Sequence, residues 1–278
     1  MFSNTKYPIQ EVDEYRFIDI TANKNDRSTL VFLHGMFGGL SNFEYLIDQL
    51  SGYYRIFVPE IPLYNFSKKN LSIPKLSKWL EHILTNHEIK HSILLGNSMG
   101  GHIALEYALH NTEKVEALVL SGSSGLFEND FGNSKPRRGD RDYIRERAEM
   151  TFYDNSFVDA ALVDEILEVV QSTRKLLRLL KLARATHSYN MENLLGEIHH
   201  EVLLIWGKND VITPPEVGES FAEKLPNATL KWIDKCGHAP MMERPERFYE
   251  YLKDFLDHKT NLNKKISSHE KEENYSHL

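Results

Sequence analysis

The chain has only one cysteine, Cys236, among its 278 residues. An internal disulfide is therefore excluded, as is a cysteine-based metal cluster, and we expect a reducing compartment, the cytoplasm. The sequence also lacks an apolar run of about 18 residues, which a membrane-spanning helix requires, and its first residues lack the apolar segment of a signal peptide. We therefore expect no stable membrane insertion.

The chain also lacks an excess of positive charge. The 33 Lys and Arg residues against 40 Asp and Glu residues give a net charge of −7, so no overall positive field would collect nucleic acid. Glycine and proline are few as well, with 15 and 10 residues, which excludes collagen-like and low-complexity chains. The 41% of hydrophobic residues is enough for a sizeable core, and we expect the partner to be a small-molecule substrate. Oligomeric state has no signature in the sequence.

Short apolar runs alternate with helical stretches along most of the chain. Several of the runs, such as LVFL and VLLIW, are apolar without alternation, as expected of strands covered by helices on both faces. The pattern predicts an α/β fold with a doubly wound, mostly parallel sheet. The predicted strands are residues 16–20, 29–33, 55–58, 92–95, 117–120, 202–206 and 229–233.

The alternation stops between residues 126 and 195, where only helical periodicity remains, over 143–152, 157–170 and 173–187. A block of helices that interrupts such a pattern predicts a cap inserted above the sheet. We therefore divide the chain into a core of residues 1–125 and 196–257, a helical cap of residues 126–195 and a charged tail of residues 258–278. The tail has too few apolar side chains to offset the entropy of ordering, and we expect it to be disordered.

The run HSILLGNSMGGHIALEYAL places Gly96, Ser98 and Gly100 between a strand and an amphipathic helix. This spacing is typical of a nucleophile elbow, in which a sharp strand-to-helix turn exposes the serine hydroxyl. The turn crowds the positions two residues before and after the serine, so glycine is required at both. Ser98 is thus the candidate nucleophile, although the short motif by itself is also compatible with a serine that caps a helix.

A serine hydroxyl needs a base and an orienting carboxylate, and both must come from elsewhere in the chain. Asp210 follows a buried strand, and His238 follows the last strand. Because the carboxyl ends of parallel strands lie at one edge of a sheet, Ser98, Asp210 and His238 are expected to meet there as a catalytic triad. Asp234 also precedes His238, but we interpret it as a turn former.

The negative charge that develops in acyl transfer needs two backbone donors. We assign one to the amide of Met99, at the start of the elbow helix, and the other to Met36 in the glycine-containing loop HGMFGG, with Phe37 as the alternative. His34 is expected to hold this loop by hydrogen bonds.

Phe37 and Met241 are our candidates for the lining of an apolar substrate pocket, since flexible thioethers and aromatic rings suit such a site. Ordinary core packing explains such residues equally well.

Four segments, HGMFGG, GNSMGG, WGKND and GHAPMMERP, together resemble the α/β-hydrolase superfamily in its cap-bearing serine branch, over about residues 28 to 257. The resemblance implies that Ser98 is the nucleophile, Asp210 the acid and His238 the base. GNSMGG is similar to the carbon-carbon bond hydrolases of aromatic ring cleavage. In those enzymes a tryptophan commonly follows the catalytic histidine, whereas Ala239 and Pro240 follow it here.

We therefore expect a serine hydrolase that cleaves small or medium carboxylic esters through an acyl-enzyme, without a metal or an organic cofactor. Two alternatives stay open: a carbon-carbon bond hydrolase or lyase on the same triad, and a ligand receptor with incidental hydrolysis. His238 must be neutral to act as a base. Activity should therefore decline on the acid side of a pKa near about 6.5, unless burial displaces it.

Overall fold

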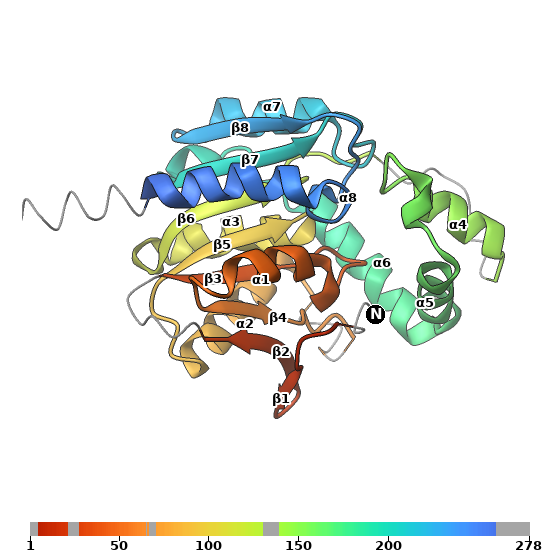
Figure 1. Cartoon of the computed structure of the whole chain (residues 1–278). Helices are drawn as coiled ribbons and strands as arrows, with labels where there is room; N and C mark the ends of the chain where they lie inside the picture. Colours follow the sequence, from red (N-terminus) through yellow and green to blue (C-terminus); the bar gives the residue numbers. More distant parts are fainter. Residues whose placement is uncertain (1–4, 22–27, 65, 67–70, 130–138, 260–278) are drawn as a thin grey trace, which may run out of the picture.

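The computed structural model describes residues 5–21, 28–64, 66, 71–129 and 139–259. Their centre is an eight-stranded sheet with the strand order β1-β2-β4-β3-β5-β6-β7-β8 (Figure 1). β1 pairs with β2, and β2 with β4, in antiparallel fashion, while the ladders from β4 to β8 are all parallel. The predicted α/β class with a mostly parallel sheet is confirmed.

All seven predicted strands are present, and an eighth, β1, was not foreseen. β1 is a three-residue edge strand with every residue exposed, so it has no apolar run from which sequence patterning could detect it. The strands are β1 (Gln10–Val12), β2 (Tyr15–Ile20), β3 (Thr29–Leu33), β4 (Ile56–Pro59), β5 (Ser92–Asn97), β6 (Val115–Ser121), β7 (Glu201–Gly207) and β8 (Ala228–Ile233).

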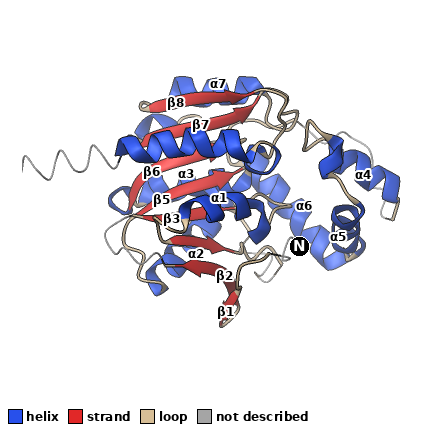
Figure 2. Cartoon of the chain, viewed as in Figure 1, coloured by secondary structure: helices blue, strands red, loops and turns tan. Residues whose placement is uncertain are grey.

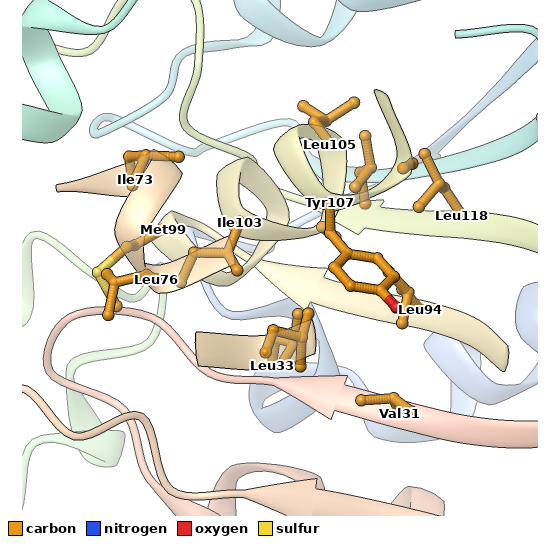
Figure 3. Close-up of a cluster of buried hydrophobic side chains, with 14 of the residues drawn as sticks. Val31, Leu33, Ile73, Leu76, Leu94, Met99, Ile103, Leu105, Tyr107 and Leu118 are labelled. Atoms are coloured by element: carbon orange, nitrogen blue, oxygen red, sulfur yellow. The ribbon is translucent and has the colours of Figure 1, made fainter. Parts of the chain in front are cut away.

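Helices cover both faces of the sheet, as Figure 2 shows. On one face α2 (Ile73–Asn86), α3 (Met99–His110) and α7 (Pro215–Lys224) bury the first core cluster, part of which is drawn in Figure 3. On the other face α1 (Glu44–Leu50) and a helix over residues 245–259 bury the second.

Alternate residues of one strand serve the two clusters, because successive side chains of a strand point to opposite faces. In β3, Val31 and Leu33 join the first cluster, whereas Leu30 and Phe32 join the second. All four are at most 2% exposed. This two-sided burial explains why the runs LVFL and VLLIW are continuously apolar.

Three helices are inserted between β6 and β7: α4 (Arg141–Glu149), α5 (Ala160–Gln171) and α6 (Thr173–Ser188). Figure 1 places them beyond the arrowheads of the parallel strands, at the edge where the strand ends converge. α4 and α5 share a small cluster of their own, formed by Ile144, Ala148, Val158, Leu162 and Val163. Short 3-10 helices occupy Leu40–Phe43, Thr112–Lys114, Asn155–Phe157 and Leu195–Glu197.

One basic side chain of α6 is buried. Arg178 is 7% exposed, and its guanidinium donates a hydrogen bond to the carbonyl of Phe66. This contact ties α6 to the segment that follows β4.

Residues 258 and 259, at the start of the tail expected to be disordered, belong to the helix over 245–259, and residues 260–278 lie outside the described part of the chain. Among the described helices, none is both long enough and apolar enough to cross a membrane.

Candidate active site

Ser98 occupies a strained turn between β5 and α3. Its backbone has φ 52° and ψ −122°, a conformation that non-glycine residues seldom adopt. A Cβ added at Gly96 would lie 2.5 Å from the backbone of Gly100, and one at Gly100 would lie 2.1 Å from the carbonyl oxygen of Leu33. Both glycines are therefore required by close backbone approach, which is the steric pattern of a nucleophile elbow.

The loop that follows β3 lies against this turn. A Cβ built on Gly35 would be 3.2 Å from the Cβ of Ser98, and the amide of Gly38 donates to the carbonyl of Gly35 at 3.1 Å. This tight turn carries Met36 and Phe37 at its centre, beside Ser98. Met99 begins α3, and the first amides of a helix have no acceptor within it. The two amides expected to receive an oxyanion thus come from segments that flank the Ser98 side chain.

His34 holds this loop in place. Its Nε2 accepts a hydrogen bond from the amide of Ile61 at 2.9 Å, so Nδ1 carries the proton and donates to the carbonyl of Gly35 at 2.8 Å. Burial lowers the pKa of His34 to about 4, against a smaller opposing effect of the Gly35 carbonyl. The imidazole is therefore neutral at physiological pH, and its Nε2 joins the loop after β3 to the loop after β4.

Asp210 and His238, which lie 28 positions apart in the sequence, are hydrogen-bonded. The Nδ1 of His238 lies 2.8 Å from Oδ2 of Asp210, and the two residues are 6% and 2% exposed. A buried carboxylate on Nδ1 leaves Nε2 as the basic nitrogen of the ring.

The Asp210 carboxylate is fixed by three further donors. Its Oδ1 accepts hydrogen bonds from the amides of Ile212 at 2.8 Å and Thr213 at 3.0 Å. The hydroxyl of Thr213 donates to Oδ2 at 2.9 Å and lies 3.2 Å from Nδ1 of His238. Sequence reasoning missed Thr213, although the spacing Asp-x-x-Thr at a loop is typical of side chains that bond to nearby backbone.

A second missed residue, Asn97, connects the turn at Ser98 to the loop of residues 234–239. This loop carries His238, and we call it the histidine loop. The side-chain amide of Asn97 donates to the carbonyl of His238 at 3.0 Å and to that of Ser121 at 2.9 Å. The backbone of Ser98 is held in turn by its own amide, which donates to Ser121 at 3.0 Å. Between these two described residues, no hydrogen bond joins the Ser98 hydroxyl directly to His238.

The pKa of His238 reflects two opposing effects. Burial alone would lower it, but the Asp210 carboxylate, through its charge and its hydrogen bond, and to a smaller extent Glu128, raise it above its ordinary value. The net direction is upward, so His238 takes up a proton more readily than a free histidine.

The environments of Asp234 and Cys236 do not favour a catalytic role for either. Asp234 is paired with Lys208 at 2.7 Å and its side chain is 78% exposed, in keeping with a turn residue. Cys236 is fully buried, and burial raises the pKa of its thiol, which disfavours the reactive thiolate. Across the described residues, no group of three or more His, Cys, Asp or Glu side chains could hold a metal ion.

The two residues considered for the pocket lie in different environments. Phe37 is 38% exposed on the loop beside Ser98, whereas Met241 is 1% exposed within the second core cluster. The burial of Met241 favours the packing role that we considered for it.

Comparisons with known proteins identify the family of the chain. The model of the alpha/beta hydrolase family matches residues 30–251. "Uncharacterized hydrolase YugF" of Bacillus subtilis is 28% identical over 83% of this chain and 90% of its own length. A 2-hydroxy-6-oxononadienedioate/2-hydroxy-6-oxononatrienedioate hydrolase of Pseudomonas putida is 27% identical over 87% and 93%.

Among solved structures, an alpha/beta hydrolase enzyme from the metagenome of lagoon sediments at Mar Chica, Morocco, is 34% identical. The similarity covers 91% of this chain and 99% of that one, with a TM-score of 0.74. The family model spans most of the chain, residues 30–251 of 278. The chain therefore belongs to the alpha/beta hydrolase family and is a hydrolase.

Proposed function

We propose that the protein is a serine hydrolase that cleaves small or medium carboxylic esters through an acyl-enzyme. Ser98 attacks the carbonyl carbon, and His238 accepts the hydroxyl proton at Nε2 and returns it to the leaving alcohol. Asp210 holds the imidazole in the tautomer that leaves Nε2 free. Water, activated by the same histidine, then releases the acid.

The observation that carries this proposal is the pairing of His238 with Asp210 beside the elbow. The 2.8 Å hydrogen bond orients the imidazole, and Asn97, the neighbour of Ser98, holds the carbonyl of His238 at 3.0 Å. The amides of Met36 and Met99 supply the oxyanion donors in this mechanism, and each such donor typically contributes about 10² to 10³ in rate.

The surrounding elements complete the proposal. The helices α4 to α6 act as the cap over the substrate, with residues 126–195 as the cap and residues 1–125 and 196–257 as the core. Phe37 contacts the acyl or alcohol group from the oxyanion loop, and the enzyme works on a small-molecule substrate in the cytoplasm.

A second candidate is cleavage of a carbon-carbon bond on the same triad. It is supported by relatives such as the Pseudomonas putida enzyme, named a 2-hydroxy-6-oxononadienedioate/2-hydroxy-6-oxononatrienedioate hydrolase. We rank it second because Ala239 and Pro240, rather than a tryptophan, follow His238.

A substrate panel tests the proposal. Purified protein is assayed with p-nitrophenyl esters from acetyl to octanoyl, an acyl thioester and a vinylogous diketone. We expect the highest kcat/KM for an ester, together with stoichiometric labelling of Ser98 by a fluorophosphonate, located by mass spectrometry. Preference for the diketone would replace the first candidate by the second. No turnover and no labelling would reject both and leave a ligand receptor.

The pH profile of kcat/KM provides a further prediction. The free enzyme is active only when His238 is neutral, so activity is lost as the pH falls through its pKa. Because Asp210 raises that pKa despite burial, we expect the midpoint of the acid limb above 6.5. Ester hydrolysis measured from about pH 5 to about pH 9 checks this expectation. A profile that is flat over the range, or a midpoint below that of a free histidine, would contradict it.

A further inference from the structure

A buried carboxylate that the mechanism above does not use lies five residues after His238. Glu243 ends the short helix α8 (Pro240–Glu243) and is 3% exposed. A charged group so deeply buried requires hydrogen-bond partners, because the cost of removing it from water is otherwise large. Its two oxygens have different partners, and these belong to two different parts of the molecule.

One oxygen binds the histidine loop and the other binds the helical insertion. Oε2 accepts a hydrogen bond from the amide of Gly237 at 2.6 Å, and Oε1 accepts one from the amide of Asp154 at 2.7 Å. Asp154 follows α4 and lies 89 positions before Glu243. Glu243 thus bridges the backbone next to His238 and the segment of residues 151–154, which we call the latch segment.

The latch segment also contacts the histidine loop directly. The amide of His238 donates to the carbonyl of Thr151 at 2.7 Å. A Cβ added at Gly237 would lie 2.6 Å from the same Thr151 oxygen and 2.9 Å from the backbone of Phe152, so the two segments touch without space for a side chain. The insertion is therefore packed against the backbone of the residue that carries the base.

Three of the contacts that hold His238 come from different parts of the chain. Asp210 fixes its ring, Asn97 fixes its carbonyl, and Thr151 of the latch segment accepts from its amide. The first two contacts come from the core, whereas the third depends on the insertion staying in place. A misplacement of about 1 Å in such a group can reduce a rate by about 10².

We propose that Glu243 is a positioning residue that fastens the latch segment to the histidine loop and so keeps His238 aligned for catalysis. This inference rests on the proposed function, since it assigns His238 the role of base. The inserted helices then have two roles: they cover the substrate, and their contact with the histidine loop keeps His238 in place. Loss of the carboxylate leaves the amides of Gly237 and Asp154 without this acceptor, and both belong to the segments that must stay together.

Two variants, Glu243→Gln and Glu243→Ala, test the proposal. Glu246→Gln is the matched control, because it makes the same change at an exposed position three residues later. With p-nitrophenyl acetate we expect kcat to fall by about 10-fold to 100-fold in Glu243→Ala, less in Glu243→Gln, which keeps one acceptor, and not in the control. KM should change by less than about threefold, and fluorophosphonate labelling of Ser98 should slow in parallel with kcat.

Two kinetic outcomes would overturn it. If the folded variants lose thermal stability but keep the wild-type kcat well below their Tm, Glu243 serves the fold alone. If only KM rises, and only for long-chain esters, the residue shapes the substrate site and does not align His238.

Hydrogen exchange separates failure of this inference from failure of the proposed function. The amides of Gly237, His238 and Asp154 should exchange faster in both Glu243 variants than in the control, whatever the substrate is. Unchanged exchange at these amides would reject the latch. Faster exchange in a protein that hydrolyses no ester would support the latch as a contact while rejecting the ester hydrolase.

Discussion

Ser98→Ala is expected to lose on the order of 10⁶ in kcat for ester hydrolysis, the scale typical of removing the nucleophile of a serine hydrolase. The acyl-enzyme cannot form without Oγ, and only the oxyanion donors and substrate binding remain. Steady-state assay at saturating ester measures the loss, and the burst of product in the first turnover should disappear with it.

The fold should tolerate this change. Alanine has the same Cβ as serine, so the strain at φ 52° is the same in the variant, and the hydroxyl of Ser98 makes no hydrogen bond with His238 that would be lost. We therefore expect a Tm close to that of the wild type. Cys236→Ala is the matched control, because it removes the single cysteine thiol of the chain, the alternative nucleophile that we considered. Its burial predicts activity within about threefold of the wild type. If Ser98→Ala keeps its turnover, or if Cys236→Ala loses fluorophosphonate labelling, the nucleophile is a residue other than Ser98.

Sequence patterning predicted the central sheet well, and the reason lies in the burial of its strands. β3, β5 and β7 contribute side chains to both core clusters, so their apolar runs are continuous and bounded by turns. β1 has neither property. β1 pairs with β2 through backbone hydrogen bonds at an exposed edge, and such pairing does not require an apolar pattern in the sequence.

The same contrast applies to the candidate site. Ser98, Asp210 and His238 could be proposed from the sequence because each follows a strand whose end lies at one edge of a parallel sheet, and the steric demand for Gly96 and Gly100 is visible in the motif. Thr213, Asn97 and Glu243 could not, since each acts on a segment distant in the sequence or through backbone groups. The contact between Asp154 and Glu243 spans 89 positions, and no local pattern predicts it.

Asp210→Asn is expected to lower kcat by about 10⁴ while leaving the fold intact. The geometry explains why the effect should be so large for a change of one atom. Oδ1 of Asp210 accepts from two backbone amides, of Ile212 and Thr213, which can only donate. An asparagine must therefore keep its carbonyl oxygen on that side, and its amide nitrogen takes the place of Oδ2, facing Nδ1 of His238.

The amide group of that asparagine is a donor, so Nδ1 of His238 must present its lone pair and the ring proton moves to Nε2. Nε2 is then unable to accept the proton of Ser98, and the base is lost through its tautomer. kcat and the labelling rate measure the effect, with Asp234→Asn as the matched control, because Asp234 is 78% exposed and bonded to Lys208. Thr213→Val should cost far less, since it removes one donor to Oδ2 and leaves the 2.8 Å bond to His238. A loss of tenfold or less in Asp210→Asn, roughly 1.4 kcal/mol or below, would show that Asp210 does not set the tautomer.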